Sequence, residues 1–308
     1  MDMHVPHALL QVPQPFIRPT LDRSSEIIFS NQLKARIDAE TNSIWCRWQP
    51  DPRPCFNPRL LSDLRRYCEF VAGSEGRIEW DDETMLLEYT VICFAIPKVF
   101  NLGGDLELFT RLIDGRDRAG LLLYGQACID VLYQNYRAYN LPITTISLVQ
   151  GDCLGGGFEC ALSSDIIIAE KSARFGFPEI LFNLFPGMGA YSFLDRKIGQ
   201  RAAEELLMSG KVYSADDMLA RGVVDVVCDD GAGEAEVAAF VRKSARSRNG
   251  MAAIFAARRR VHKLEFSELL EIVELWVDSA LRLTSRDLKL MQRLVSRQNE
   301  MGGSTLVH

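Results

Sequence analysis

Two strongly apolar segments flank a glycine-rich turn near the middle of the chain. Residues 143–151, ITTISLVQG, and residues 165–170, DIIIAE, have the composition of buried strands. Between them, residues 155–164 read GGGFECALSS, a pattern that predicts a short buried helix. Because strands alternate with helices here and through the first two thirds of the chain, the sequence predicts an α/β fold with parallel strands.

The chain divides into three regions by composition and periodicity. Residues 1–25 contain four prolines, which supply no backbone donor, so we predict an arm outside the core. Residues 26–229 carry the strand and helix signals of a catalytic core, and residues 230–308 are predicted to be helical throughout. One long helix is predicted over residues 267–295.

The composition is that of an ordinary globular protein. Of the 308 residues, 47% are hydrophobic, which is enough to bury a sizeable core. The formal charge is −6 and no basic stripe is interleaved with aromatic residues, so nucleic acid is not an expected partner. No apolar stretch reaches about 20 residues, which argues against a membrane span, and the N-terminus lacks the pattern of a signal peptide. We therefore expect a cytoplasmic protein.

The eight cysteines and four histidines argue against disulfide and metal chemistry. No two cysteines form a CxxC pair and most lie in apolar runs, which favours reduced, buried thiols. Three of the four histidines are near the chain ends, so a zinc site or a Ser-His-Asp triad is not expected. The sequence predicts neither a metal ion nor a cofactor.

Three consecutive glycines, at positions 155–157, join the first buried strand to the helix. Glycine has no Cβ, so backbone N–H groups can approach a ligand closely, and a helix N-terminus favours an anion. The surrounding GDCLGGGFE matches neither the phosphate loop GxxxxGK[ST] nor the dinucleotide pattern GxGxxG. On the glycines alone, a ligand role and a packing role both remain open.

Two carboxylates stand in apolar surroundings after this turn. A buried Glu159 would be costly unless it is paired, and an ion pair with Lys171 or Arg174 would explain it without a functional role. Glu179 follows Pro178, and the helix dipole favours an acidic residue in a first turn. Taken together, two such carboxylates beside an amide-rich turn predict an acid and a base for proton transfer.

A second glycine turn, NLGGD at residues 101–105, follows a predicted strand and precedes a predicted helix. Two turns that offer backbone amides could hold one carbonyl oxygen from both sides. Each donor of such an oxyanion hole is typically worth about 2.7–4 kcal/mol.

Several motifs of the chain occur together in one known superfamily. LGGGFE, FGFPEI and FPGMG follow one another, and the GGGxE…PE pair has a highly specific 20-residue spacing. RPCFNPRLLSDL at residues 53–64 looks like an early strand-turn-helix segment, and VFNLGGDLELF at residues 99–109 looks like a first oxyanion-hole turn. This set resembles the enoyl-CoA hydratase/isomerase (crotonase) superfamily. The resemblance implies a crotonase-like core of ββα units that forms a spiral, with a C-terminal helical trimerisation region.

The resemblance assigns roles to particular residues. The two catalytic carboxylates of the family correspond to Glu159 and Glu179, and one oxyanion-hole donor corresponds to Gly156. The other donor falls within Leu102–Gly104, where Gly103 is our choice. The further residues expected to bind substrate are Leu102, Gly104, Gly155, Leu184, Phe185 and Met188. For the last three, an ordinary core position is the alternative.

Within the superfamily, WCRWQPDPRPCFNPRLL and VFNLGGDLELF are similar to the diffusible signal factor synthases. That similarity implies dehydration of a medium-chain 3-hydroxyacyl thioester, carried on acyl carrier protein or CoA, to the cis-2-enoyl thioester. Hydrolysis would then release the free cis-2-unsaturated acid used in bacterial quorum sensing. The alternatives are an ordinary enoyl-CoA hydratase of fatty-acid oxidation and a crotonase-fold binding partner of a sensor protein.

The resemblance also bears on partners. It implies a homotrimer or hexamer, in which Trp276 and its apolar neighbours could pack between subunits, and a sensor or receptor protein as a further partner. RRRVHK, at residues 258–263, is the compact basic cluster of the sequence. It could meet a CoA phosphate or an acidic carrier protein, or be a solvated helix face.

Overall fold

The computed structural model describes residues 20–21, 26–80, 83–96 and 98–303. Most of the predicted N-terminal arm therefore lies outside the described residues. Within it, strand β1 (Thr20–Leu21) pairs antiparallel with β2 (Glu26–Ile28) at the edge of the main sheet. The boundaries at residues 25 and 229 stay predictions.

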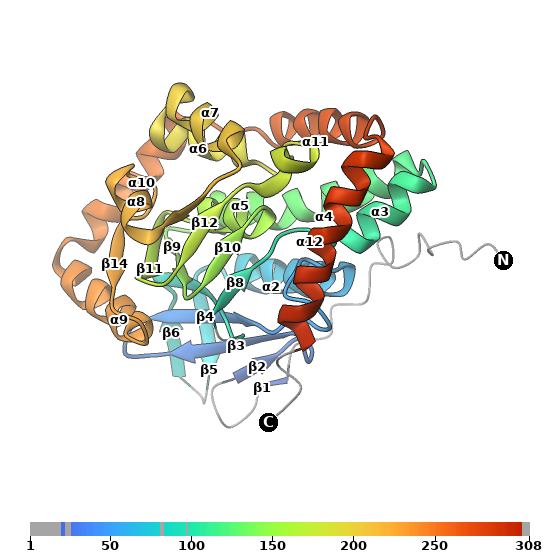
Figure 1. The fold of residues 1–308 in the computed structure, drawn as a ribbon. Coiled ribbons are helices and arrows are strands. Elements are labelled where there is room, and N and C mark those ends of the chain that lie inside the picture. The colour runs from blue at the N-terminus through green and yellow to red at the C-terminus, as the bar shows by residue number, and fades with distance from the viewer. Residues whose placement is uncertain (1–19, 22–25, 81–82, 97, 304–308) are drawn as a thin grey trace.

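The main sheet has eight strands in the order β1-β2-β3-β4-β7-β9-β11-β14 (Figure 1). Its further strands are β3 (Leu33–Asp38), β4 (Ser43–Trp48), β7 (Tyr89–Phe94), β9 (Thr144–Val149), β11 (Ile166–Glu170) and β14 (Val226–Cys228). β1 to β4 pair antiparallel, whereas β4, β7, β9, β11 and β14 are parallel neighbours. The predicted α/β class and parallel core are confirmed, with a meander of antiparallel strands added at one side.

A second sheet of four strands, in the order β13-β12-β10-β8, places the functional turns. Its strands are β8 (Val99–Asn101), β10 (Asp152–Leu154), β12 (Arg174–Gly176) and β13 (Val212–Ser214). β8, β10 and β12 are parallel, so their carboxyl ends meet at one edge. The NLGGD turn, the triple glycine and the segment that carries Glu179 each follow one of these three ends, so all three meet at that edge. A separate hairpin consists of β5 (Arg77–Trp80) and β6 (Glu83–Leu86).

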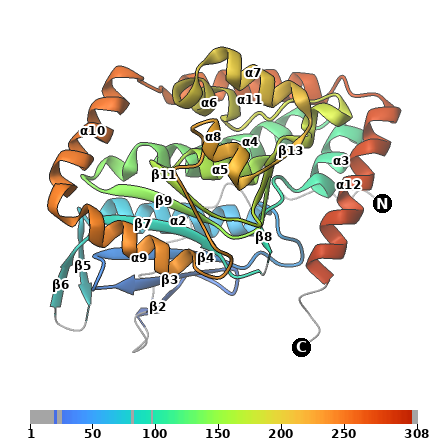
Figure 2. The ribbon, with the colours of Figure 1, turned by 60° about the vertical axis from the view of Figure 1, so that its left-hand side comes forward.

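Helices cover the two sheets (Figures 1 and 2). In chain order the α-helices are α2 (Pro58–Gly73), α3 (Leu106–Asp114), α4 (Arg118–Tyr136), α5 (Gly156–Leu162), α6 (Ala190–Ile198), α7 (Gln200–Ser209), α8 (Ala215–Ala220), α9 (Gly233–Ser244), α10 (Arg248–Val261), α11 (Phe266–Ala280) and α12 (Ser285–Gly303). Three 3₁₀ turns are η1 (Ala138–Asn140), η2 (Pro178–Phe182) and η3 (Ala245–Ser247). Among the described residues, none of these helices combines the length and apolar character needed to cross a bilayer.

The long helix predicted over residues 267–295 is two helices, α11 and α12, so that prediction is wrong. The Asp287 carboxylate accepts hydrogen bonds from the backbone N and the Oγ1 of Thr284, both at 2.8 Å. A threonine followed three residues later by an acidic residue starts a new helix, because each side chain satisfies a free backbone group of the other. The sequence TSRD at residues 284–287 carries this signal.

Two arginines of the basic cluster at residues 258–263 are used inside the fold. Arg258 and Arg259, near the end of α10, each donate to Asp165 Oδ1 at 2.6 Å. Asp165 is buried and its other oxygen accepts from Thr145 N, so the two arginines attach α10 to the start of β11. These two side chains are therefore ligands of a buried carboxylate and do not form a solvated face.

The eight cysteines are all buried free thiols, as the sequence predicts. Burial is the main cause that raises the pKa of Cys153 and of Cys160 far above the ordinary thiol value. A thiol that stays protonated is a weak nucleophile, so these cysteines act as small apolar core residues.

Candidate active site

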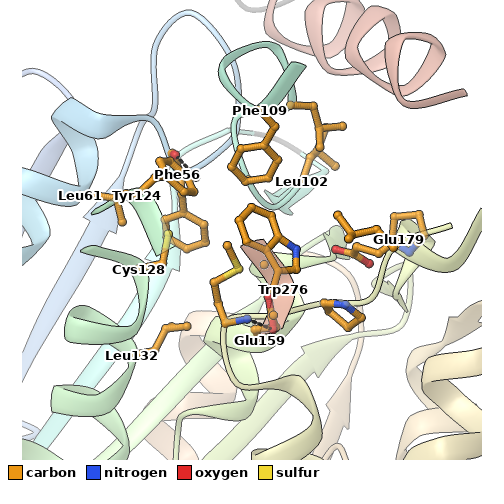
Figure 3. Close-up of a pocket in the computed structure, with 18 of the residues that line it drawn as sticks. Phe56, Leu61, Leu102, Phe109, Tyr124, Cys128, Leu132, Glu159, Glu179 and Trp276 are labelled. Carbon is orange, nitrogen blue, oxygen red and sulfur yellow. Dashed lines mark hydrogen bonds between the residues drawn. The ribbon is translucent and has the colours of Figure 1, made fainter. Parts of the chain in front are cut away.

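A pocket with an empty volume of about 680 Å³ opens at the edge where β8, β10 and β12 end (Figure 3). Of the residues that the sequence analysis singles out, its wall contains Leu102, Gly104, Gly156, Glu159, Glu179, Leu184 and Met188. Gly103 and Gly155 lie directly behind this wall, and Phe185 packs against the core instead. The structure thus brings both predicted carboxylates and both glycine turns to one place.

Glu159 reaches the pocket from α5 and is 1% exposed. Its Oε1 accepts hydrogen bonds from the backbone N–H groups of Met188, at 2.8 Å, and Ala190, at 3.0 Å. Burial raises its pKa to about 7, although the two backbone donors act in the opposite direction. Among the described residues it forms no ion pair, and Lys171 pairs with Asp229 at 2.6 Å. The explanation by an ion pair with Lys171 or Arg174 is therefore wrong.

Glu179 lies in the first turn of η2, directly after Pro178. Its carboxyl group points into the pocket, and Oε2 is buried with no hydrogen-bond partner among the described residues (Figure 3). Burial, and then the charge of Glu159, raise its pKa to about 8. The favourable position at a helix start does not explain a buried carboxyl oxygen without a hydrogen-bond partner. Such an oxygen lowers the stability of the folded state, so a functional role is the better explanation for it.

Gly155 shapes the space that the Glu179 carboxyl occupies. Its φ of +52° is unfavourable for residues with a side chain, and a Cβ built on it would overlap Glu179 Oε1. Gly155 therefore acts by leaving room for a carboxylate, which corrects its expected role as a substrate-binding residue.

The second turn differs by one residue from the expectation. The Gly103 N–H donates to Asn101 Oδ1 at 2.7 Å, so it is not available to a substrate and its assignment as the donor is wrong. Gly104 lines the pocket, and a Cβ built on Gly156 would lie 3.5 Å from Gly104 N. The two glycines on the wall are thus Gly104 and Gly156, whose main chains are close neighbours. Asn101, which the sequence analysis missed, holds this turn in place.

Large aromatic side chains that the sequence analysis did not place in the pocket complete its wall: Phe56, Phe109, Tyr124, Phe182 and Trp276. Trp276 is 2% exposed and packs edge-on against Phe109, with ring centroids 5.0 Å apart. A Cβ built on Gly187 would overlap the same indole ring. Trp276 therefore packs within its own chain, and the expectation that it packs between subunits is wrong.

The arrangement is suited to moving protons in an environment with little water. Two carboxyl groups with pKa values near neutrality face one largely apolar cavity, together with main-chain atoms of two glycines. Within the described part of the chain, no group of three or more His, Cys, Asp or Glu side chains is placed to hold a metal ion.

A model of the enoyl-CoA hydratase/isomerase family matches residues 88–275, more than half of the chain. The chain belongs to this family. The crotonase resemblance of the sequence is therefore confirmed, and with it the hydratase/isomerase type of enzyme. The match includes both glycine turns, Glu159, Glu179 and most of α11.

Solved structures share the fold of this enoyl-CoA hydratase/isomerase family member. The enoyl-CoA hydratase from Bacillus halodurans has a TM-score of 0.71 at 18% identity, over 85% of this chain and 100% of that one. The human mitochondrial delta3-delta2-enoyl-CoA isomerase has a TM-score of 0.68 at 21% identity, over 88% of this chain and 99% of that one. DspI from Pseudomonas aeruginosa has a TM-score of 0.58 at 22% identity, over 76% of this chain and 88% of that one. The crotonase-like fold is thus confirmed, including a C-terminal helical region.

Proposed function

We propose that the protein is a synthase of the diffusible signal factor type. It dehydrates a medium-chain 3-hydroxyacyl thioester to the cis-2-enoyl thioester and hydrolyses this product to the free acid. The observation that carries the proposal is the presence of Glu159 and Glu179 in one apolar pocket. Two carboxyl groups favour addition or removal of water, since isomerases and hydrolases of the superfamily often keep only one. The motif similarity to the signal synthases supports the finer substrate class.

In the dehydration, Glu179 takes the proton from the α-carbon and negative charge develops on the thioester oxygen. The main chain of the two glycine turns, which reaches the pocket wall at Gly104 and Gly156, stabilises that charge where it forms. The bond between C3 and its hydroxyl oxygen then breaks, and Glu159 gives this oxygen the proton with which it leaves as water. The two backbone hydrogen bonds to Glu159 orient its carboxyl group, which positions it to donate a proton to the leaving hydroxyl.

In the hydrolysis, a water molecule attacks the thioester carbonyl while one ionised carboxylate takes its proton. The same two glycines stabilise the tetrahedral oxyanion. Collapse of this intermediate breaks the carbon–sulfur bond, and the thiol leaves with a proton from the other carboxyl group. One pair of carboxyl groups thus serves both steps, with the proton returned to the pair each time.

The pH dependence of turnover is expected to be a narrow bell. The reaction needs one proton on the pair, which exists between the pKa of Glu159, about 7, and that of Glu179, about 8. Because Glu179 has the higher pKa and holds this proton more tightly, turnover proceeds from the minor form of the pair, in which the proton is on Glu159 and Glu179 is the ionised base. Below this window both groups are protonated and no base remains, whereas above it both are ionised and no acid remains. Measuring kcat/KM from pH 5 to pH 10 checks this, with a thioester whose thiol part carries no charge, such as 3-hydroxydodecanoyl-N-acetylcysteamine. A maximum below pH 6 would contradict it.

The proposal is tested by offering the purified protein 3-hydroxydodecanoyl-acyl carrier protein and crotonyl-CoA separately. We expect mass spectrometry to find free cis-2-dodecenoic acid from the first substrate, and ¹⁸O from labelled water in its carboxyl group. Fast hydration of crotonyl-CoA with no free acid from the carrier substrate would indicate an ordinary hydratase. Absence of any reaction would indicate a binding protein.

A further inference from the structure

One face of α12 carries a cluster of exposed positive charge. Arg286, Lys289 and Arg293 are exposed and follow one another three and four residues apart, so they lie on one side of the helix. We call these three residues the α12 cationic face. The other exposed residues in the described part of this helix are neutral: Ser285, Gln292 and Ser296.

The α12 cationic face forms no salt bridge within the described part of the chain. Its three side chains form no ion pair there, although Arg258 and Arg259 on α10 do. Asp287 is the acidic residue of the same stretch; its carboxylate is bonded to Thr284, and the charge of Arg286 contributes to lowering its pKa, so Asp287 offsets part of the charge of Arg286 alone. Since the chain as a whole carries a formal charge of −6, a helix face with three exposed cations and no salt bridge is not explained by folding.

The helix that carries this face borders the pocket. α12 packs against α3, which contributes Phe109 to the pocket wall, and against η2, which contributes Glu179. Thr110 Oγ1 lies 3.6 Å from the sulfur of Met291, and Asn183 Nδ2 lies 3.5 Å from Asp287 Oδ2. Both ribbon views place α12 beside α3, on the opposite side of the molecule from α9 and α10 (Figures 1 and 2).

We propose that the α12 cationic face docks an acidic acyl carrier protein, which delivers the acyl thioester to the pocket. This inference rests on the proposed function and adds the partner. A carrier protein cannot enter the pocket, so it must be held outside while its thioester arm reaches in. The three cations span about 10 Å along the helix axis, which fits an extended acidic surface better than one phosphate group.

The test is a charge reversal, R286E/K289E/R293E, in the full chain. Binding of the holo form of an acidic bacterial acyl carrier protein is measured by fluorescence anisotropy. We expect Kd to rise at least about tenfold, because a long-range attraction becomes a repulsion. The KM for 3-hydroxydodecanoyl-acyl carrier protein should rise with it, whereas kcat and the KM for 3-hydroxydodecanoyl-N-acetylcysteamine should stay unchanged. Added salt should weaken binding to the unmodified protein and not to the variant.

A matched control reverses three exposed cations on the far side, R242E/K243E/R246E, which changes the net charge equally. We expect Kd for the carrier protein to change less than about threefold in this control. The proposal is overturned if both variants weaken binding equally, if neither does, or if the KM for 3-hydroxydodecanoyl-CoA rises as much as that for the carrier substrate.

The binding measurement separates this inference from the proposed function. If the unmodified protein releases no free acid from any thioester, the proposed function fails, while the Kd values still decide the docking surface. If the charge-reversed variant does not fold, the neutral variant R286Q/K289Q/R293Q replaces it, with a smaller increase in Kd expected.

Discussion

Replacing Glu179 with glutamine is expected to lower kcat by about 10²–10⁴-fold. Glutamine has nearly the same shape, but it cannot take the proton from the α-carbon. Because Glu179 Oε2 has no hydrogen-bond partner among the described residues, the change breaks no contact that holds the fold. Single-turnover kinetics on 3-hydroxydodecanoyl-acyl carrier protein measure the chemical step directly.

The same variant is expected to be more stable than the unmodified protein at alkaline pH. Burial raises the pKa of Glu179 from 4.5 to about 8, so between these values the folded state binds more protons than the unfolded state. The free energy of unfolding therefore falls as pH rises through that window, and glutamine removes this loss. Thermal melts should show a Tm gain from E179Q that is larger at pH 9 than at pH 5.

Glu159→Gln is the matched variant. A glutamine carbonyl can still accept the bonds from Met188 and Ala190, so the fold should be preserved while the acid of the dehydration is lost. We expect a loss of kcat of similar size. If product still forms after each of the two substitutions, the catalytic assignment of these carboxyl groups is wrong. If E179Q changes Tm equally at pH 5 and pH 9, the raised pKa of the buried Glu179 carboxyl is contradicted.

Replacing Gly155 with alanine is expected to reduce kcat by about 10²-fold or more, although Gly155 does not touch the substrate. The new methyl group would occupy the position of Glu179 Oε1 and force the carboxyl out of line. The positive φ adds strain of about 1–3 kcal/mol, which should lower Tm by a few degrees without unfolding the protein at 25 °C. Near-ultraviolet circular dichroism and kcat on one sample check both effects.

Gly73→Ala serves as the control for this variant. Gly73 is the last residue of α2, and a Cβ built on it meets no atom within 4 Å. Kinetics and Tm should remain close to those of the unmodified protein. If G155A loses activity only in proportion to its unfolded fraction, the positioning of Glu179 by Gly155 is refuted.

The sequence predicts those elements of the fold whose signals are local. Asn57 and Pro58 mark the start of α2, inside the segment at residues 53–64 that the sequence analysis expects to be a strand, a turn and a helix. The break between α11 and α12 was missed because apolar spacing continues across it, although Thr284 and Asp287 carry the signal. The edge at which β8, β10 and β12 end together depends on strand register, which no local pattern specifies.

The candidate site was predictable where chemistry is unusual and not where it is ordinary. Glu159 and Glu179 stand out because carboxylates are rare in apolar segments. The choice between Gly103 and Gly104 depended on where the Gly103 N–H points, and in the fold it donates to the side chain of Asn101, a contact that no local sequence pattern specifies. Trp276 carries no signal at all, because an aromatic residue on an apolar helix face is most often simply core. The sequence analysis did not predict the α12 cationic face, because its three cations are neighbours on the helix surface but are separated from one another in the sequence.

The indole of Trp276 has a consequence for how this protein can be divided. It comes from the C-terminal helical region, residues 230–308, yet it packs against Gly187 and Phe109 beside the carboxyl groups. A fragment that stops at residue 229 would lack one side of its own reaction chamber and admit bulk water to it. The helical region at residues 230–308 is thus a working part of the enzyme, and a cut in the chain before it would also remove part of the pocket wall.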